Sequence, residues 1–122
     1  MTLHLGTDLV YIPRLARSLE MDGFVERIFT AQEQRTCRSS PESFAARWAA
    51  KEATVKAFGC GIARVPLRDI EVIVGPDGAP ALNLAGAASE LAAELRWSEW
   101  AVSLSHDGDY AIAVVVAASN PS

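Results

Sequence analysis

Lysine and cysteine are both scarce in this sequence of 122 residues. Lys51 and Lys56 are the only lysines, against nine arginines. The only cysteines, Cys37 and Cys60, lack the CxxC or histidine-spaced neighbours of a zinc site. Two cysteines also fall short of the disulfide framework that holds small secreted domains together. We therefore expect a reducing, cytoplasmic location.

Long hydrophobic runs and excess positive charge are absent too. No apolar stretch approaches the roughly 20 residues that cross a bilayer, and "MTLHLGTDLV" lacks the pattern of a signal peptide. A membrane location is therefore not expected. The net charge of −4 argues against a nucleic-acid partner, which needs basic patches, but allows a small anion held by one or two local cations. The length favours a single domain over residues 1–122.

Hydrophobic patterning and turn residues predict an α+β fold. Helices are expected after Pro13, up to a stop at Gly23, and after Thr30, whose Glu33 three residues later gives a capping box. A short helix over "FVERIF" and an alanine-rich helix over 85–96 are also predicted. A long helix should run from 41 to 58 and end at Gly59. Strands are predicted over 3–12, 69–75, 80–85, 100–106 and 110–118, and the "PDG" and "DGD" turns make their pairing antiparallel.

The long helix carries an unusual polar face. Glu52 shares a side with Phe44 and Trp48, and Lys56 follows it by one turn. A carboxylate between large apolar groups is costly unless it meets a cation. The alternative is an ordinary exposed ion pair between Glu52 and Lys56. Lys51, beside them, is expected to be solvated or to lie along the surface by its stem.

A second acid, Asp8, lies inside the first predicted strand, where acids are disfavoured. Alone it is equally well explained as a strand-end acid bonded to the backbone. Paired with Glu52, it would supply two hard oxygen ligands of the kind that Mg²⁺ accepts when phosphates and water complete its octahedron. Lys56 could then meet a phosphate, and the glycines Gly59 and Gly61 would let a ligand approach the backbone.

Three separated segments together resemble one family. They are "GTDLVYIPR" (6–14), "FAARWAAKEATVKAFGCGI" (44–62) and "VSLSHDGDYAIAVVV" (102–116). In order and spacing they are similar to the holo-acyl-carrier-protein synthases, the short bacterial type of 4′-phosphopantetheinyl transferase. Each motif is weak alone, and the three together are highly specific. The resemblance implies that family's fold, an antiparallel sheet packed around a long central helix.

The resemblance also assigns roles to residues. It implies that Asp8 and Glu52 bind a Mg²⁺ ion that also contacts the coenzyme A pyrophosphate, and that Lys56 contacts the phosphates. These three residues form the expected catalytic set. Arg14 matches an arginine that meets acidic residues of the carrier protein, and its alternative is an ordinary solvated charge. The residues expected to bind coenzyme A are Lys56, Arg47, Gly59, Gly61 and His106, although a lone histidine is more often a packed or surface residue.

The implied reaction moves 4′-phosphopantetheine from coenzyme A to a serine of an apo acyl carrier protein and releases adenosine 3′,5′-bisphosphate. The family also implies a homotrimer with sites between subunits. Two other hypotheses are a Mg²⁺-dependent phosphohydrolase acting on coenzyme A and a non-catalytic coenzyme A-binding trimer. The sequence leaves open the carrier protein, the choice of Mg²⁺ or Mn²⁺, and whether Glu52 itself accepts the serine proton.

Overall fold

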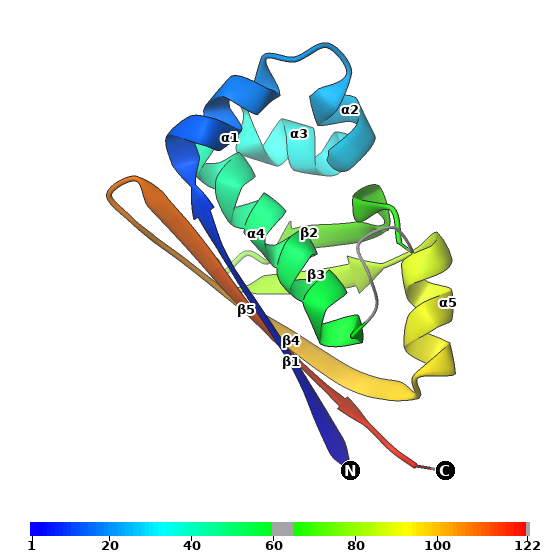
Figure 1. Ribbon diagram of the computed structural model, residues 1–122. Helices are drawn as coiled ribbons and strands as arrows, with labels where there is room; N and C mark the ends of the chain where they lie inside the picture. Colours follow the sequence, from blue (N-terminus) through cyan, green and yellow to red (C-terminus); the bar gives the residue numbers. More distant parts are fainter. Residues whose placement is uncertain (60–64, 122) are drawn as a thin grey trace.

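The computed structural model describes residues 1–59 and 65–121, and Figure 1 shows the arrangement of its elements. In chain order they are β1 (Thr2–Tyr11), α1 (Ile12–Leu19), α2 (Phe24–Ile28), α3 (Ala31–Cys37), α4 (Pro41–Phe58), η2 (Leu67–Asp69), β2 (Ile70–Val74), β3 (Pro80–Leu84), α5 (Gly86–Glu94), β4 (Trp97–Asp107) and β5 (Tyr110–Ser119). The predicted α+β class is confirmed.

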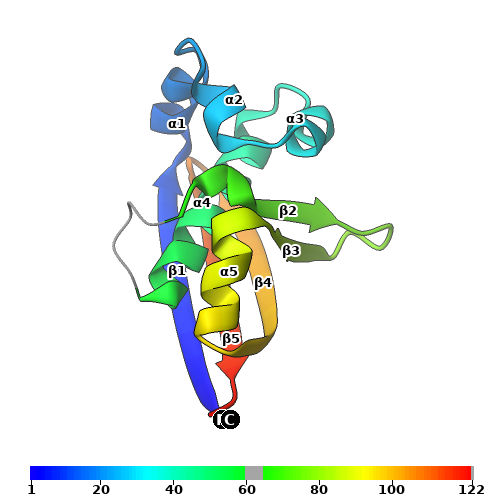
Figure 2. The ribbon, with the colours of Figure 1, turned by 90° about the vertical axis from the view of Figure 1, so that its right-hand side faces the viewer.

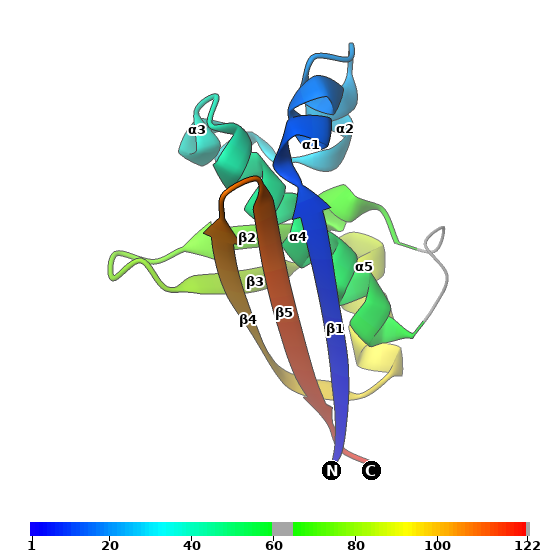
Figure 3. The ribbon, with the colours of Figure 1, turned by 60° about the vertical axis from the view of Figure 1, so that its left-hand side comes forward.

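Two antiparallel sheets make up the β structure. The larger has the strand order β1-β5-β4, and the smaller is the β2–β3 hairpin. Helix α4 crosses one face of the larger sheet, and α1, α2 and α3 gather near its N-terminal end (Figure 1). Helix α5 and the hairpin lie on the same side of that sheet as α4 (Figure 2). None of the helices of residues 1–59 and 65–121 lies on the opposite face of the sheet (Figure 3).

Small residues let α4 lie close to the sheet. The residues of β5 that are buried beneath it are Ala111, Ala113, Val115 and Ala117. On β1 the closest approach is at Gly6, where an added Cβ would lie 1.8 Å from the carbonyl oxygen of Ala53 on α4. Asp8 follows Gly6 by two residues and therefore points to the same face of β1. The close packing thus brings the polar side chain of β1 beside the helix.

Local signals fix the ends of α3 and α4 as predicted, whereas α1 ends at Leu19 and Gly23 instead precedes α2 as its N-cap. The Thr30 hydroxyl accepts a hydrogen bond from the Glu33 backbone, and the Glu33 carboxylate accepts one from the Thr30 backbone, so the capping box is confirmed. The Ser40 hydroxyl caps α4 by accepting from the Ser43 N–H. Gly59 ends α4 in the left-handed region with φ of 75°, where a glycine is favoured.

The expectation for Lys51 was wrong. Its side chain is fully buried, and its ammonium lies 2.7 Å from the equally buried carboxylate of Glu33 on α3. Sequence spacing within α4 could not reveal this, because the partner belongs to another helix. Burial lowers the pKa of Lys51, and the Glu33 carboxylate opposes that shift.

Among the described residues, no helix is long and apolar enough to cross a membrane.

Replacing Gly6 tests the close approach of α4 to β1. Gly6→Ala should lower the free energy of unfolding by at least the upper end of the range of about 1–3 kcal/mol typical of overpacking, because the new methyl group meets backbone atoms. Urea unfolding followed by circular dichroism measures it. Gly75→Ala is the matched control, since its added Cβ meets the Asp77 carboxylate at 3.2 Å and no backbone atom that closely. Equal stabilities of the Gly6 variant and the wild type would contradict the packing described.

Candidate functional site

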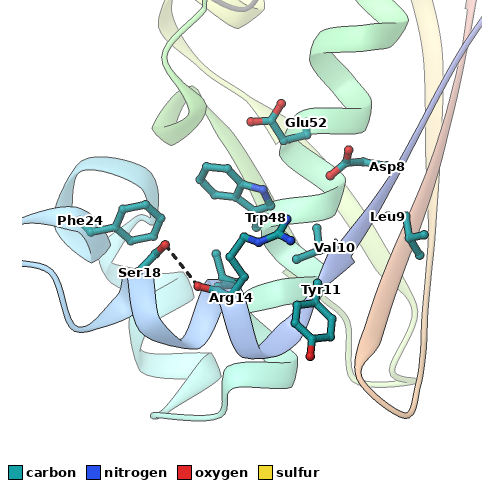
Figure 4. Close-up of a pocket in the computed structure, with 10 residues that line it drawn as sticks. Asp8, Leu9, Val10, Tyr11, Arg14, Ser18, Phe24, Trp48 and Glu52 are labelled. Atoms are coloured by element: carbon teal, nitrogen blue, oxygen red, sulfur yellow. Dashed lines mark hydrogen bonds between the residues drawn. The ribbon is translucent and has the colours of Figure 1, made fainter.

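A cavity of about 320 Å³ opens between β1, α1 and α4. Both acids singled out in the sequence line it, Asp8 from β1 and Glu52 from α4 (Figure 4). The remaining lining residues are Leu9, Val10, Tyr11, Arg14, Leu15, Ser18, Phe24 and Trp48. The volume lies at the lower end of the range of roughly 300–1,000 Å³ that small-molecule sites occupy. The structure therefore brings the predicted pair of carboxylates together within one chain.

The negative charge of Asp8 affects the protonation of Glu52. Burial raises the pKa of Glu52, the negative charge of Asp8 raises it further, and the Lys56 ammonium opposes both. Two like charges held in a partly buried cavity repel each other, and a cation placed between them would relieve that repulsion. The repulsion between Asp8 and Glu52 costs free energy, and it acts in a cavity that a ligand can enter.

Lys56 lies at the rim of this cluster. Its ammonium donates to the Asp8 Oδ1 at 3.1 Å and to the Thr7 carbonyl oxygen at 3.0 Å. The ion-pair partner of Lys56 is therefore Asp8 on β1. The alternative explanation predicted an ion pair with Glu52 on α4, and Lys56 does not form it. The Lys56 side chain is 55% exposed, so its ammonium can turn toward an incoming anion with little loss of packing.

Aromatic side chains and Arg14 close the other end of the cavity. Phe24 stacks on Trp48 with ring centroids 5.6 Å apart, and the Arg14 guanidinium carbon lies 5.7 Å from the centre of the Tyr11 ring. Arg14 belongs to the exposed surface of α1 and also lines the cavity. Sequence reasoning missed Tyr11, Phe24 and Ser18 as lining residues. Their meeting depends on how α1 and α2 fold back on α4, for which the sequence carries no local signal.

Arg47 and His106 form a separate cluster at the opposite edge of the sheet. They line a smaller cavity of about 190 Å³ together with Ser43 and Ser105. Arg47 is 6% exposed, its Nη1 donates to the Ser43 carbonyl oxygen at 3.3 Å, and its Nε has no hydrogen-bond partner among residues 1–59 and 65–121. Strand β5 separates β4, which carries His106, from β1, which carries Asp8 (Figure 3). The predicted site residues thus fall into two groups within one chain.

Gly59 and Gly61 were predicted to let a ligand approach the backbone after α4. Gly59 follows the last turn of α4, one turn beyond Lys56, and no atom of the other residues within 1–59 and 65–121, its chain neighbours aside, lies within 4 Å of the place where its Cβ would be. The C-terminal end of a helix is the negative end of its dipole, so any charge attraction for an anion must come from Lys56. Gly61 lies outside the described residues.

Comparison with known proteins identifies the family. Residues 4–115 match the 4′-phosphopantetheinyl transferase superfamily, and the chain belongs to it. A holo-acyl-carrier-protein synthase from Herpetosiphon aurantiacus is 46% identical over 120 residues, which cover 91% of this chain and 94% of that protein. A complex of ACPS with coenzyme A from Chronobacterium ammoniagenes has a TM-score of 0.88 and 34% identity, covering 98% and 99% of the two chains. The structure of the Helicobacter pylori holo-acyl-carrier-protein synthase in complex with coenzyme A has a TM-score of 0.85 and is 32% identical in sequence. The match covers 93% of this chain and 99% of that chain.

The raised pKa of Glu52 gives a testable effect on stability. A carboxyl whose pKa is higher in the folded state destabilises the fold once it ionises, so the cost is present near pH 7 and vanishes as the pH falls below the ordinary value of about 4.3. Glu52→Gln should therefore raise the melting temperature of metal-free protein near neutral pH and leave it unchanged in acid. Thermal unfolding in the presence of EDTA measures the difference, with Glu90→Gln on the exposed side of α5 as the control. A lower melting temperature at neutral pH would contradict the repulsion.

Proposed function

We propose that this protein transfers 4′-phosphopantetheine from coenzyme A to a serine of an apo acyl carrier protein and releases adenosine 3′,5′-bisphosphate. The observation that carries the proposal is the convergence of Asp8 and Glu52 on one cavity, with Lys56 beside them. The names of the relatives and the coenzyme A in two of the matching structures support the same reaction.

The donor set of the cavity fits a divalent cation. Two carboxylates offer hard oxygen ligands, and their mutual repulsion favours a positive ion between them. Within the part of the chain that the structure describes, no cluster of three or more histidine, cysteine or acidic side chains occurs. Asp8 and Glu52 would therefore hold Mg²⁺ or Mn²⁺ only together with ligands from water and substrate phosphates. When bound, the ion supplies positive charge that stabilises the leaving phosphate oxygen.

The side chains of this protein have separate tasks in the transfer. Lys56 turns from Asp8 to the phosphates and neutralises charge as it grows. The serine oxygen bonds to the phosphorus that carries pantetheine, the bond from that phosphorus to the bridging oxygen breaks, and the bisphosphate leaves with the electron pair. Glu52, or a water molecule that it orients, would accept the serine proton. Gly59, which has no side chain, would let the coenzyme approach the backbone one turn beyond Lys56.

The division of the site residues supports a homotrimer. Coenzyme A would be held by Lys56 of one subunit and by Arg47 and His106 of its neighbour, because these groups lie at opposite edges of one sheet. The sheet face that no helix covers is apolar, with Leu5 64% exposed. The other large apolar side chains exposed on this face are Leu3, Leu9, Tyr110, Ile112 and Val114. Contiguous apolar surface of this kind marks a protein interface.

Carrier-protein binding is assigned to α1. Arg14 and Arg17 are exposed on this helix, three residues apart, and α1 contains no acidic residue. Their charge would attract an acidic carrier protein and orient its serine toward the cavity that Arg14 lines.

The buried free thiol of Cys37 is compatible with a reducing cytoplasm as the location of the reaction.

Intact-mass measurement of an apo carrier protein tests the proposed function. Mixed with this protein, coenzyme A and Mg²⁺, the carrier should gain one phosphopantetheine on its serine. Asp8→Asn and Glu52→Gln should abolish the gain while circular dichroism shows an unchanged fold, because each removes a ligand oxygen and its charge. Unmodified serine across several carrier proteins would overturn the proposal. Release of bisphosphate without any carrier protein would instead indicate a phosphohydrolase.

Subunit complementation tests the homotrimer. Asp8→Asn and His106→Ala variants, each weak alone, should recover part of the activity when they are unfolded, mixed and refolded together, because some interfaces then hold both intact halves. Leu5→Lys should lower the mass measured by light scattering from trimer to monomer, since it places a charge on the apolar face. Val74→Lys, at an exposed site on β2, is the control. A monomeric wild type, or mixtures without recovery, would contradict the shared site.

A further inference from the structure

The buried pair of Lys51 and Glu33 is the most completely bonded polar feature of the interior. The Lys51 ammonium donates to the Glu33 Oε1 at 2.7 Å, to the Ile70 carbonyl oxygen at 2.6 Å and to the Leu67 carbonyl oxygen at 3.1 Å. An ammonium has three N–H groups, so every donor is used. Each bond has a fixed direction, and together they hold the side chain in one orientation.

Glu33 connects the same point to two further segments. Its Oε1 also accepts from the Thr30 N–H at 3.0 Å, and its Oε2 accepts from the Val72 N–H at 2.9 Å. The pair therefore links α4 to the start of α3, to η2 and to β2. Neither residue touches the cavity that holds Asp8 and Glu52, since neither lines it.

Helix α4 is buried over most of its circumference, and six of its buried residues are alanines: Ala45, Ala46, Ala49, Ala50, Ala53 and Ala57. Larger contacts restrain the helix at other points, because Phe44 packs against Phe29, Trp48 stacks on Phe24, and Phe58 stacks on Trp97. Apolar contacts have little directionality, whereas the hydrogen bonds of Lys51 are directional. These bonds act on the residue next to Glu52 and therefore add a restraint on the rotation of α4 at that point.

We propose that Lys51 and Glu33 are positioning residues, which set the rotation of α4 and so direct Glu52 into the cavity toward Asp8. The inference rests on the proposed function. Lys51 and Glu52 are consecutive and therefore project about 100° apart around the helix. Because side-chain ends lie about 6 Å from a helix axis, a rotation of about 20° would move the Glu52 carboxylate by about 2 Å. A displacement of that size is enough to cost a reaction about a hundredfold or more.

Stability alone gives no reason for this pair. Removing two charges from water is expensive, and apolar replacements of a buried ion pair are often neutral or stabilising. A pair that is retained in spite of this cost is expected to contribute a defined geometry. Here that geometry reaches the cavity through the next residue along the chain.

The test compares Lys51→Met/Glu33→Gln with the wild type. Removing both charges avoids a buried unpaired ion, so the variant should fold, which circular dichroism and thermal unfolding check. We expect kcat for transfer to fall about tenfold or more with the KM for the carrier protein within about twofold, because the surface of α1 is unchanged. Mn²⁺ affinity, measured by electron paramagnetic resonance with coenzyme A and no carrier protein, should also fall about tenfold. Glu33→Asp, which keeps the ion pair but shortens the side chain, should give a smaller loss in both.

Thr54→Val is the matched control. Thr54 is fully buried on the same helix, and within the described part of the chain its hydroxyl bonds only to the Ala50 carbonyl oxygen of α4. The variant is expected to lose stability while keeping kcat and Mn²⁺ affinity. All assays are run at a temperature where every variant is folded, so a smaller folded fraction does not mimic a displaced Glu52.

The outcomes separate the two proposals. Wild-type kcat and Mn²⁺ affinity in the folded double variant, or equal losses in Thr54→Val, would overturn the positioning role. If the double variant does not fold, the same criteria apply to Glu33→Asp, which keeps both charges and withdraws the carboxylate by one methylene group. A wild type that binds Mn²⁺ but transfers nothing would overturn the proposed function, and the Mn²⁺ affinities would still decide the role of Lys51.

Discussion

The close approach of α4 to β1 at Gly6 is the constraint on which the rest of the structure depends. No other residue type fits beneath the Ala53 carbonyl, and the alanines of β5 continue the same shallow surface. Because side chains alternate along a strand, this contact places Asp8 next to α4, and the helix in turn offers Glu52. Packing in the core therefore sets the distance between two charges that would otherwise separate.

The negative charges of Asp8 and Glu52 lower the stability of the fold, and they also attract a cation to the cavity. Burial and the negative charge of Asp8 raise the pKa of Glu52, while Lys56 partly compensates from the rim. The cation site that we propose here would therefore be built at the expense of folding free energy. The buried Lys51 has a different task from Lys56, although only five residues separate them. Lys51 bonds to groups inside the protein, and Lys56 lies at the rim of the cavity, where we propose that it meets phosphates.

Much of the fold could be predicted because its signals are local. The Thr30–Glu33 capping box, the Gly59 cap and the turns of the two hairpins involve residues that are neighbours in the sequence, and the structure confirms them. Lys51 could not be predicted, since its partners on α3, η2 and β2 are brought to it only by tertiary folding. The cavity residues Tyr11 and Phe24 were missed for the same reason. Asp8 and Glu52 were predicted as a pair because three motifs, taken together, outweighed the alternative explanation of each residue alone, and the structure places both on one cavity.

A crystal of this protein with Mn²⁺ and coenzyme A would test the central claim most directly, because anomalous scattering locates the ion independently of the protein atoms. A peak bonded to carboxylate oxygens of both Asp8 and Glu52 of one subunit, and to the coenzyme phosphates, is the predicted result. A peak bound to only one of these carboxylates, or an ion held elsewhere while the coenzyme is in place, would contradict it.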